Sequence, residues 1–370
     1  MLDDALRGMT VVDLSQGIAG PYCASLLADF GARVIKVEPP GGDWLRLAGG
    51  TSAMFETFNR GKQSIVLDLK SPKGVASVRQ LAKAVDVVVE SARVGVMEGL
   101  GLGYAELKSR HPELVYTSIS GFGQTGPNAF LPATDTVIQA YAGIAAHATS
   151  LPGFPRIRLA IVDLVSGLYA HQATLAALMK LWRTGKGHWV QVDLMHSMAA
   201  LQAYKIADVL VNDNVGEDEA FAIIGNYMAA DGAFAISGAS DKHVVACLHA
   251  LDLSAMLQEP AFANPAARHA HQSGLRLRMA AVLASMSLAE VIRRLRAVGV
   301  PCQRILDYKG FVAEAEVNAP SLFQSLQSAH GTSIPSVRTP ATSAGRKLER
   351  APALDEHAVR IGAEFNLECK

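Results

Sequence analysis

The sequence is poor in cysteine, in aromatic side chains and in any surplus of charge. Its four cysteines, Cys23, Cys247, Cys302 and Cys369, are widely scattered and form no C-x-x-C pair, which argues against a disulfide framework and against a cysteine-bound metal. Thirty-four basic residues balance 34 acidic ones, so no net field recruits nucleic acid or an anionic membrane. We therefore expect a soluble, cytoplasmic protein that binds no metal and no nucleic acid.

Signals for export or membrane insertion are also lacking. The first ten residues, MLDDALRGMT, are acidic and polar, where a signal peptide would be basic and then apolar. The most apolar long run, residues 164–182, is interrupted by His171, Gln172 and Lys180, which makes it too polar for a membrane span. The sequence therefore predicts neither export nor membrane insertion.

The motifs of several large enzyme classes are missing. No G-x-S-x-G, H-E-x-x-H or P-loop occurs, so serine hydrolase, zinc protease and kinase readings lack support. A G-x-G-x-x-G frame does occur, at Gly121, Gly123 and Gly126, but Pro127 follows it and would break the helix that must begin there. No acidic residue stands about 20 positions on to bind a ribose. The frame therefore predicts a strand that ends in a glycine-rich loop and disfavours NAD binding.

A regular alternation of strand and helix patterns runs through the first 120 residues. Val- and Ile-rich runs alternate with longer helical patterns: TVVDLS, ARVIKVE, SIVLDL, DVVVES and VYTSIS are the strands. Such alternation predicts an α/β domain with a mostly parallel sheet covered by helices on both faces. With 370 residues, half of them apolar, the chain is longer than chains that usually fold around a single hydrophobic core. We predict a large domain over 1–204, a linker over 205–225, a smaller α+β domain over 226–310 and a C-terminal segment over 311–370 that returns to the large domain.

Carboxylates and glycine loops remain as candidate sites. Asp163 follows the apolar run LAIV and opens a predicted helix over 163–184; its ordinary role is to cap that helix, and the alternative is a nucleophile at the end of the sheet. Asp135 offers the same choice, with the cap favoured. Arg60 and Lys62, which flank a glycine, fit either a phosphate cradle or a surface turn.

Several stretches together resemble the family III CoA-transferases (CaiB/BaiF), the group of formyl-CoA transferase, carnitine CoA-transferase and α-methylacyl-CoA racemase. The stretches, in chain order, include GMTVVDLSQGIAGPYCASLLADFGARVIKVEPPGGD, FNRGKQSIVLDLKSPKG, ELVYTSISGFGQTGP and AIVDLVSGLYAHQATLAALMKLWRTGKGHWVQVDL. The likeness covers most of residues 7–200 and returns near 227–310.

The resemblance implies a Rossmann-like large domain, a small domain and an interlocked homodimer. It implies that Asp163 attacks an acyl-CoA to form an anhydride and then an aspartyl-CoA thioester, from which a carboxylic acid takes the CoA. No cofactor is implied, because CoA is a substrate. The implied substrate contacts are Ile18, Ala19, Gly20, Asn59, Arg60, Lys62, Ser91, Ala92, Arg93 and Asp135, with the loop Gly121, Phe122 and Gly123 covering the thioester.

Departures from the family pattern leave alternatives open. Ser91, Ala92 and Val94 stand where the family usually has Asn-Phe and a proline, and Gly99 replaces a frequent basic residue; a catalytically weak acyl-CoA-binding relative is one alternative. An acyl-CoA racemase is another, although Thr134 stands where racemases have a histidine that would supply the second base. Transferase is the favoured reading, and an unrelated α/β oxidoreductase is the reading from a different class.

Overall fold

The computed structural model describes residues 1–46, 51–147, 156–212, 222–319 and 321–367. These form two compact units, Met1–Asp208 with Ala319–Lys370 and Val209–Asn318, and each is described by itself. Part of the segment 205–225, which the sequence suggests is a linker, lies outside the described residues. The domain boundaries suggested by the sequence stay a prediction.

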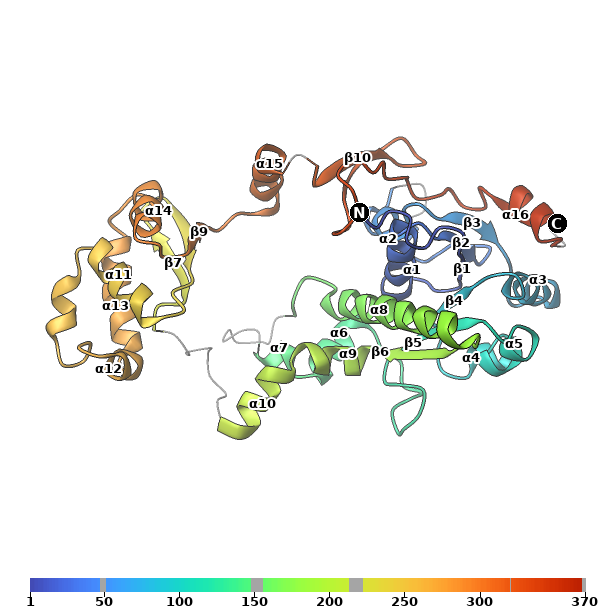
Figure 1. Cartoon of the computed structure of the whole chain (residues 1–370), viewed down its shortest axis with the longest axis horizontal. Coiled ribbons are helices and arrows are strands. Elements are labelled where there is room, and N and C mark those ends of the chain that lie inside the picture. The colour runs from blue at the N-terminus through green and yellow to red at the C-terminus, as the bar shows by residue number, and fades with distance from the viewer. Residues whose placement is uncertain (47–50, 148–155, 213–221, 320, 368–370) are drawn as a thin grey trace. The chain divides into compact units, whose positions relative to one another are not determined.

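Six parallel strands form the sheet of the first unit, and the predicted α/β architecture is confirmed. The strands run in the order β3-β2-β1-β4-β5-β6 (Figure 1), and every neighbouring pair is parallel. This is the strand order of the Rossmann fold, in which ligands bind outside the carboxyl ends of the strands where the order reverses. Here the reversal lies between β1 and β4. The strands are β1 (Thr10–Asp13), β2 (Arg33–Glu38), β3 (Gln63–Val66), β4 (Val87–Glu90), β5 (Val115–Ser120) and β6 (Trp189–Asp193).

Helices cover both faces of this sheet because successive strand residues point to opposite sides. Val11 and Val89 join the core under α1 (Ala19–Asp29) and α8 (Ile161–Thr184). Val12 and Val88 join the opposite core, which is covered by α3 (Pro72–Ala82), α4 (Val96–Gly99), α5 (Tyr104–Arg110) and α16 (Ala358–Glu364). The remaining helices of this unit are α2 (Ala53–Asn59), α6 (Asp135–Tyr141), α7 (Ile144–His147), α9 (Leu194–Leu201) and α10 (Ala203–Asn212).

Local signals set several helix ends. Ser71 caps α3, since its hydroxyl accepts the Gly74 N–H at 3.0 Å, and Pro72 occupies the first helical position, where no N–H is needed. The chain leaves α1 through Gly31 at φ +100°, a backbone conformation that favours glycine. Residues within one turn therefore set both helix ends.

The capping roles expected for the two aspartates are wrong. Helix α8 begins at Ile161 with Ala160 as its N-cap, so Asp163 is the third helical residue and caps nothing. Helix α6 has Thr134 as its N-cap. Instead of capping α6, the Asp135 carboxylate accepts the Val162 N–H at 2.8 Å and so satisfies an unpaired donor at the start of α8.

Helix α8 is, among the described residues, the one helix long and apolar enough to cross a membrane by length and composition. Its buried positions include Ser166, His171 and Thr174, and the Thr174 hydroxyl contacts that of Thr117 on β5 at 2.7 Å. The helix also packs closely along α1. The apolar side chains on its buried face are therefore accounted for by packing in the α/β core.

The second unit has a small antiparallel sheet with helices on one side. Strands β7 (Gly225–Ala229), β8 (Gly232–Ile236) and β9 (Cys302–Arg304) pair in that order. Phe234 of β8 is fully buried, and Leu275, Val291 and other apolar side chains of the helices pack around it. The helical elements are α11 (Asp241–Ala250), the short η1 (Ser254–Gln258), α12 (Pro265–Ala270), α13 (Gln272–Leu283), α14 (Leu288–Ala297) and α15 (Tyr308–Asn318).

The C-terminal segment attaches to the edge of the large sheet. After the hairpin of β10 (Phe323–Gln327) and β11 (Ser333–Val337), Asp355 accepts the Val66 N–H at 2.7 Å and the His357 N–H donates to the Ser64 carbonyl at 2.9 Å. These bonds satisfy backbone groups of β3 that an edge strand would leave open.

Candidate active site

A cavity of about 660 Å³ opens at the reversal point of the sheet. Its walls are the segments that follow β1, β4 and β5, together with the stretch that leads into α8. Because these strands are parallel, their carboxyl ends meet at one edge, and the segments after them converge there. The predicted site residues that line the cavity are Ile18, Ala19, Gly20, Ser91, Ala92, Arg93, Gly121, Asp135 and Asp163.

Asp163 is one of the residues that line this cavity. Within the described part of the chain, no hydrogen bond or ion pair holds that carboxylate. Burial raises the pKa of Asp163 to about 7, and the neighbouring Asp135 carboxylate adds to the effect. Both causes act by disfavouring the charged form. An ionised Asp163 is therefore poorly solvated and free of partners, which is the condition of an activated nucleophile.

Asp135 has both of its carboxylate oxygens occupied. One accepts the Val162 N–H, and the other accepts from the Gln139 amide at 2.6 Å. The side chain is buried and lies one turn before Gln139 on α6. Asp135 therefore joins α6 to the start of α8 directly before Asp163.

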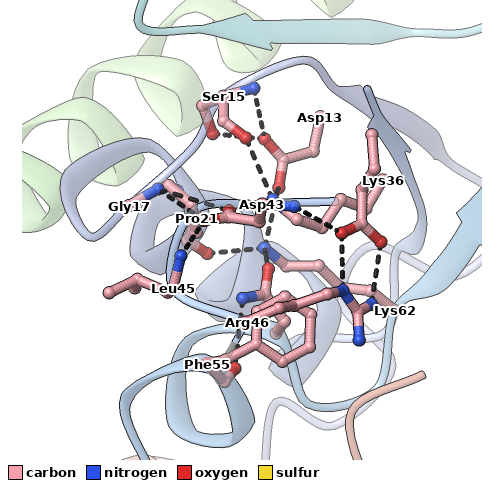
Figure 2. A network of polar contacts seen from close by, with 12 residues as sticks. Asp13, Ser15, Gly17, Pro21, Lys36, Asp43, Leu45, Arg46, Phe55 and Lys62 are labelled. Carbon is pink, nitrogen blue, oxygen red and sulfur yellow. Dashed lines mark hydrogen bonds and ion pairs between the residues drawn. The ribbon is translucent and has the colours of Figure 1, made fainter. Parts of the chain in front are cut away.

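A network of buried charged side chains holds the segment after β1 in place (Figure 2). Lys36 donates to the Ser15 carbonyl at 2.9 Å and pairs with Asp43 at 2.9 Å, while Asp43 accepts the Gly17 N–H at 3.3 Å. Lys62 donates to Asp13 at 2.7 Å and to the Pro21 carbonyl at 2.8 Å. The backbone that lines the cavity is thus anchored at three points by fully buried side chains.

Three predicted CoA contacts, Asn59, Arg60 and Lys62, lie outside the described lining of this cavity. Lys62 has no exposed side-chain surface, and burial lowers its pKa to about 8 while Asp13 acts in the opposite direction. The Asn59 amide oxygen accepts from Lys62 at 2.9 Å. Arg60 is buried and bonds to Asp29 and Thr339. The charged ends of Lys62 and Arg60 are therefore paired with aspartates inside the protein, and the CoA contact expected at this turn stays a prediction.

The glycine loop after β5 contains no helix before α6 begins at Asp135, so it is not a dinucleotide-binding turn. Gly121 lines the cavity, and a Cβ there would lie 2.2 Å from the Ala133 Cβ, too close for any side chain. Phe122 is buried edge-on against Tyr141, and Gly123 adopts φ +91°. Of the three predicted loop residues, only Gly121 reaches the cavity.

Several lining residues escaped prediction. Gln16, Trp44, Met54, Arg156 and Arg158 all face the cavity. The signal that could have found the arginines is the stretch PRIRLAIVD, which sets two cations shortly before Asp163.

Two kinds of group are lacking around the site. No histidine belongs to the described lining, and Thr134 stands at the position of the racemase base. Within the part of the chain that the structure describes, no cluster of three or more His, Cys, Asp or Glu side chains fits a metal ion.

Comparison with known sequences gives a family match along nearly the whole chain. The model of CoA-transferase family III matches residues 6–358. A succinate–glutarate CoA-transferase of Agrobacterium fabrum is 32% identical, over 97% of this chain and 95% of that protein. An acetyl-CoA:oxalate CoA-transferase of Acetobacter aceti is 33% identical over the same shares of both chains.

Comparison with solved structures agrees. A CaiB/BaiF family protein from Brucella suis superposes with a TM-score of 0.86 at 30% identity, covering 98% of this chain and 100% of that one. The protein Rv3272 of Mycobacterium tuberculosis superposes with a TM-score of 0.85 at 30% identity, covering 96% of this chain and 98% of that one. This chain therefore belongs to CoA-transferase family III, the enzymes that move CoA between acyl-CoA thioesters and acids.

Proposed function

We propose that this enzyme transfers CoA from an acyl-CoA to a carboxylic acid with Asp163 as the covalent nucleophile. The observation that carries the proposal is the state of Asp163, which lines the cavity. Its carboxylate has no partner among the described residues, and burial and Asp135 raise its pKa to about 7. A carboxylate with only a structural role would accept hydrogen bonds from the protein, as Asp135 does from the Val162 N–H and the Gln139 amide.

The chemistry proceeds in four balanced steps. An oxygen of Asp163 attacks the acyl carbon, the C–S bond breaks, and CoA leaves as a thiolate from a mixed anhydride. The thiolate attacks the Asp163 carbonyl and releases the donor acid, which leaves an aspartyl-CoA thioester. The acceptor carboxylate then displaces the thiolate to form a second anhydride. The thiolate finally attacks the acceptor's carbonyl, which yields the new acyl-CoA and restores the Asp163 carboxylate.

The cavity offers donors for the charge that develops on the reacting carbonyl. Ser120 lines it, and the buried hydroxyl of Ser120 has no hydrogen-bond partner among the described residues. Gly121, the next residue, lines the same cavity, and its lack of a side chain leaves room for Ala133 behind it. Preorganised donors of this kind stabilise an oxyanion more than mobile water does.

The names of the relatives support acids as both donor and acceptor. The proteins of A. fabrum and A. aceti are named for succinate and glutarate and for oxalate. We propose that CoA lies along the segments after β1 and β4, where Arg93 is exposed on the cavity wall, and that no cofactor takes part. We also propose that the enzyme works in the cytoplasm.

We further propose that the enzyme is an interlocked homodimer. Exposed apolar side chains on α8 and α10 support an interface. Leu168, Met179 and Trp182 on α8 are 47%, 60% and 63% exposed, and Tyr204 on α10 is 70% exposed. Large exposed apolar patches mark interaction surfaces. A second copy of the chain would cover this surface.

Trapping of the intermediate tests the mechanism. Incubation with an acyl-CoA and hydroxylamine is expected to convert Asp163 to its hydroxamate, which peptide mass spectrometry would locate. Asp163→Asn is expected to lose at least roughly 1,000-fold in CoA transfer. The control Asp4→Asn removes an exposed carboxylate and should retain full turnover. Active wild-type enzyme with an unmodified Asp163 would refute the mechanism.

A further inference from the structure

One short stretch of chain carries both a cation and the candidate nucleophile into the cavity. Arg158 and Asp163, five residues apart, line the same cavity, and Arg158 is exposed there. Within the described residues, Arg158 makes no hydrogen bond or ion pair. The stretch comes directly before and into α8.

Helix α6 holds this stretch on both sides of the arginine. The Gln139 amide oxygen accepts the Ile157 N–H at 3.0 Å, and its nitrogen donates to the carbonyls of Ile157 at 3.2 Å and Leu159 at 3.3 Å. Gln139 is 1% exposed, so these bonds are shielded from water. Asp135, one turn earlier on α6, holds Val162. The backbone is therefore fixed on either side of Arg158 and directly before Asp163, which preorganises the spacing between them.

The charges of the cavity favour an anionic group near Arg158. Arg156 is bound to the Thr136 hydroxyl at 2.8 Å, and Arg93 belongs to a different segment, after β4. A carboxylate that approaches Asp163 meets the negative charge of Asp135 as well, and an uncommitted guanidinium offsets that repulsion. The planar guanidinium can bind a carboxylate through two parallel hydrogen bonds. A ligand with a neutral amide in place of the carboxylate cannot accept both.

We propose that Arg158 binds the distal carboxylate of a dicarboxylic acid whose other carboxylate reacts at Asp163, so that Arg158 selects dicarboxylic over monocarboxylic acids. The inference rests on the proposed function, because it takes Asp163 as the reacting end.

A competition between two acceptors of equal length tests it. The enzyme receives succinyl-CoA as donor and an equimolar mixture of glutarate and glutaramate, in which an amide replaces the distal carboxylate. Mass spectrometry measures the initial ratio of glutaryl-CoA to glutaramyl-CoA. Because both products come from one reaction, the ratio does not depend on the amount of folded enzyme or on the donor step. Wild-type enzyme is expected to favour glutarate strongly.

Arg158→Gln is expected to lower that ratio by about 10- to 100-fold, the range for hydrogen bonds to a charged group. Arg158→Lys keeps the positive charge but not the planar guanidinium. Its product ratio should lie between those of the wild type and Arg158→Gln. The control Arg110→Gln, on the exposed surface of α5, should keep the wild-type ratio. A ratio unchanged in Arg158→Gln, or a wild type that does not distinguish the acceptors, would overturn the inference. Wild-type enzyme that turns over without hydroxamate at Asp163 would overturn the proposed mechanism instead.

Discussion

At the scale of single residues, Asp163 combines a reactive position with an unfavourable environment. Burial first, and then the Asp135 charge, raise its pKa to about 7. Attack on a thioester requires the ionised form, so the rate of hydroxamate formation should rise with pH, reach half of its maximum near pH 7 and become level above it. The rate measured across pH 5–9 with saturating acyl-CoA checks this. A rate that is already level at pH 5 would contradict it.

Asp135 contributes to that pKa through its charge. Asp135→Asn removes the like charge and keeps an oxygen that can accept the Val162 N–H, so the pKa of Asp163 should fall and the midpoint of hydroxamate formation should move to lower pH. The same pH series, run on the variant, measures the shift. An unchanged midpoint would mean that burial alone sets the pKa.

We also expect the buried position of Asp163 to lower the free energy of unfolding of the protein at neutral pH. In the unfolded chain the pKa of Asp163 is close to 3.8, and in the folded protein it is about 7. The folded state holds its proton more tightly, so the cost of ionisation is absent below pH 4, grows between pH 4 and 7, and is complete above pH 7. Asp163→Asn should therefore raise the free energy of unfolding at pH 8 by about 2–4 kcal/mol and by much less at pH 4. Denaturant unfolding at both pH values measures this, and an equal change at both would contradict it.

At the scale of elements, the buried charges link β1, β2 and β3 to the segment that lines the cavity. Lys62→Met leaves Asp13 buried with only Lys36, at 3.9 Å, as a charged partner. Removal of one member of a buried ion pair typically costs about 3–5 kcal/mol. We expect a loss of this size in urea unfolding. The double variant Asp13→Asn with Lys62→Met should recover part of it, because no unpaired charge remains, and a double variant no more stable than the single one would contradict this explanation.

The loop between β5 and α6 depends on close backbone approach. Gly121→Ala would place a methyl group 2.2 Å from the Ala133 Cβ, so the loop must move and the cavity wall must change. We expect transfer activity to fall at least about 10-fold, because small displacements of reacting groups are costly. Gly41→Ala is the matched control, since a Cβ there meets nothing within 4 Å. Steady-state kinetics of both variants test the prediction, and equal activities would refute it.

At the scale of the whole molecule, the proposed dimer predicts both mass and exchange behaviour. Light scattering should give twice the mass of the chain, and Trp182→Glu, on the exposed apolar surface of α8, should weaken the assembly. Interlocked chains cannot separate without unfolding. Two differently tagged preparations should therefore form mixed dimers only after denaturation and refolding, and rapid exchange in native buffer would refute interlocking.

The architecture of the large unit could be predicted from the sequence because its signals are local. Runs such as VVVE and VYTSIS are apolar enough to be buried on both faces, and Ser71 with Pro72 begins a helix through groups within one turn. Asp163 was singled out by its place after an apolar run and by family resemblance. The predicted start of the helix at Asp163 lies two residues after the observed start at Ile161. The N-cap residue Ala160 has no capping side chain that would mark this start in the sequence.

Which residues share the cavity was decided only by the tertiary structure. Lys62 and Arg60 carry the charges that a sequence reader assigns to a ligand, yet both are turned into the interior, where Asp13 and Asp29 neutralise them. Arg158 was not predicted as a site residue, and it lines the cavity on a stretch whose backbone Gln139 holds. The physical reason is the strand order: the reversal between β1 and β4 brings together segments that are distant in the chain. Periodicity predicts each strand, but it carries no information about which strands become neighbours.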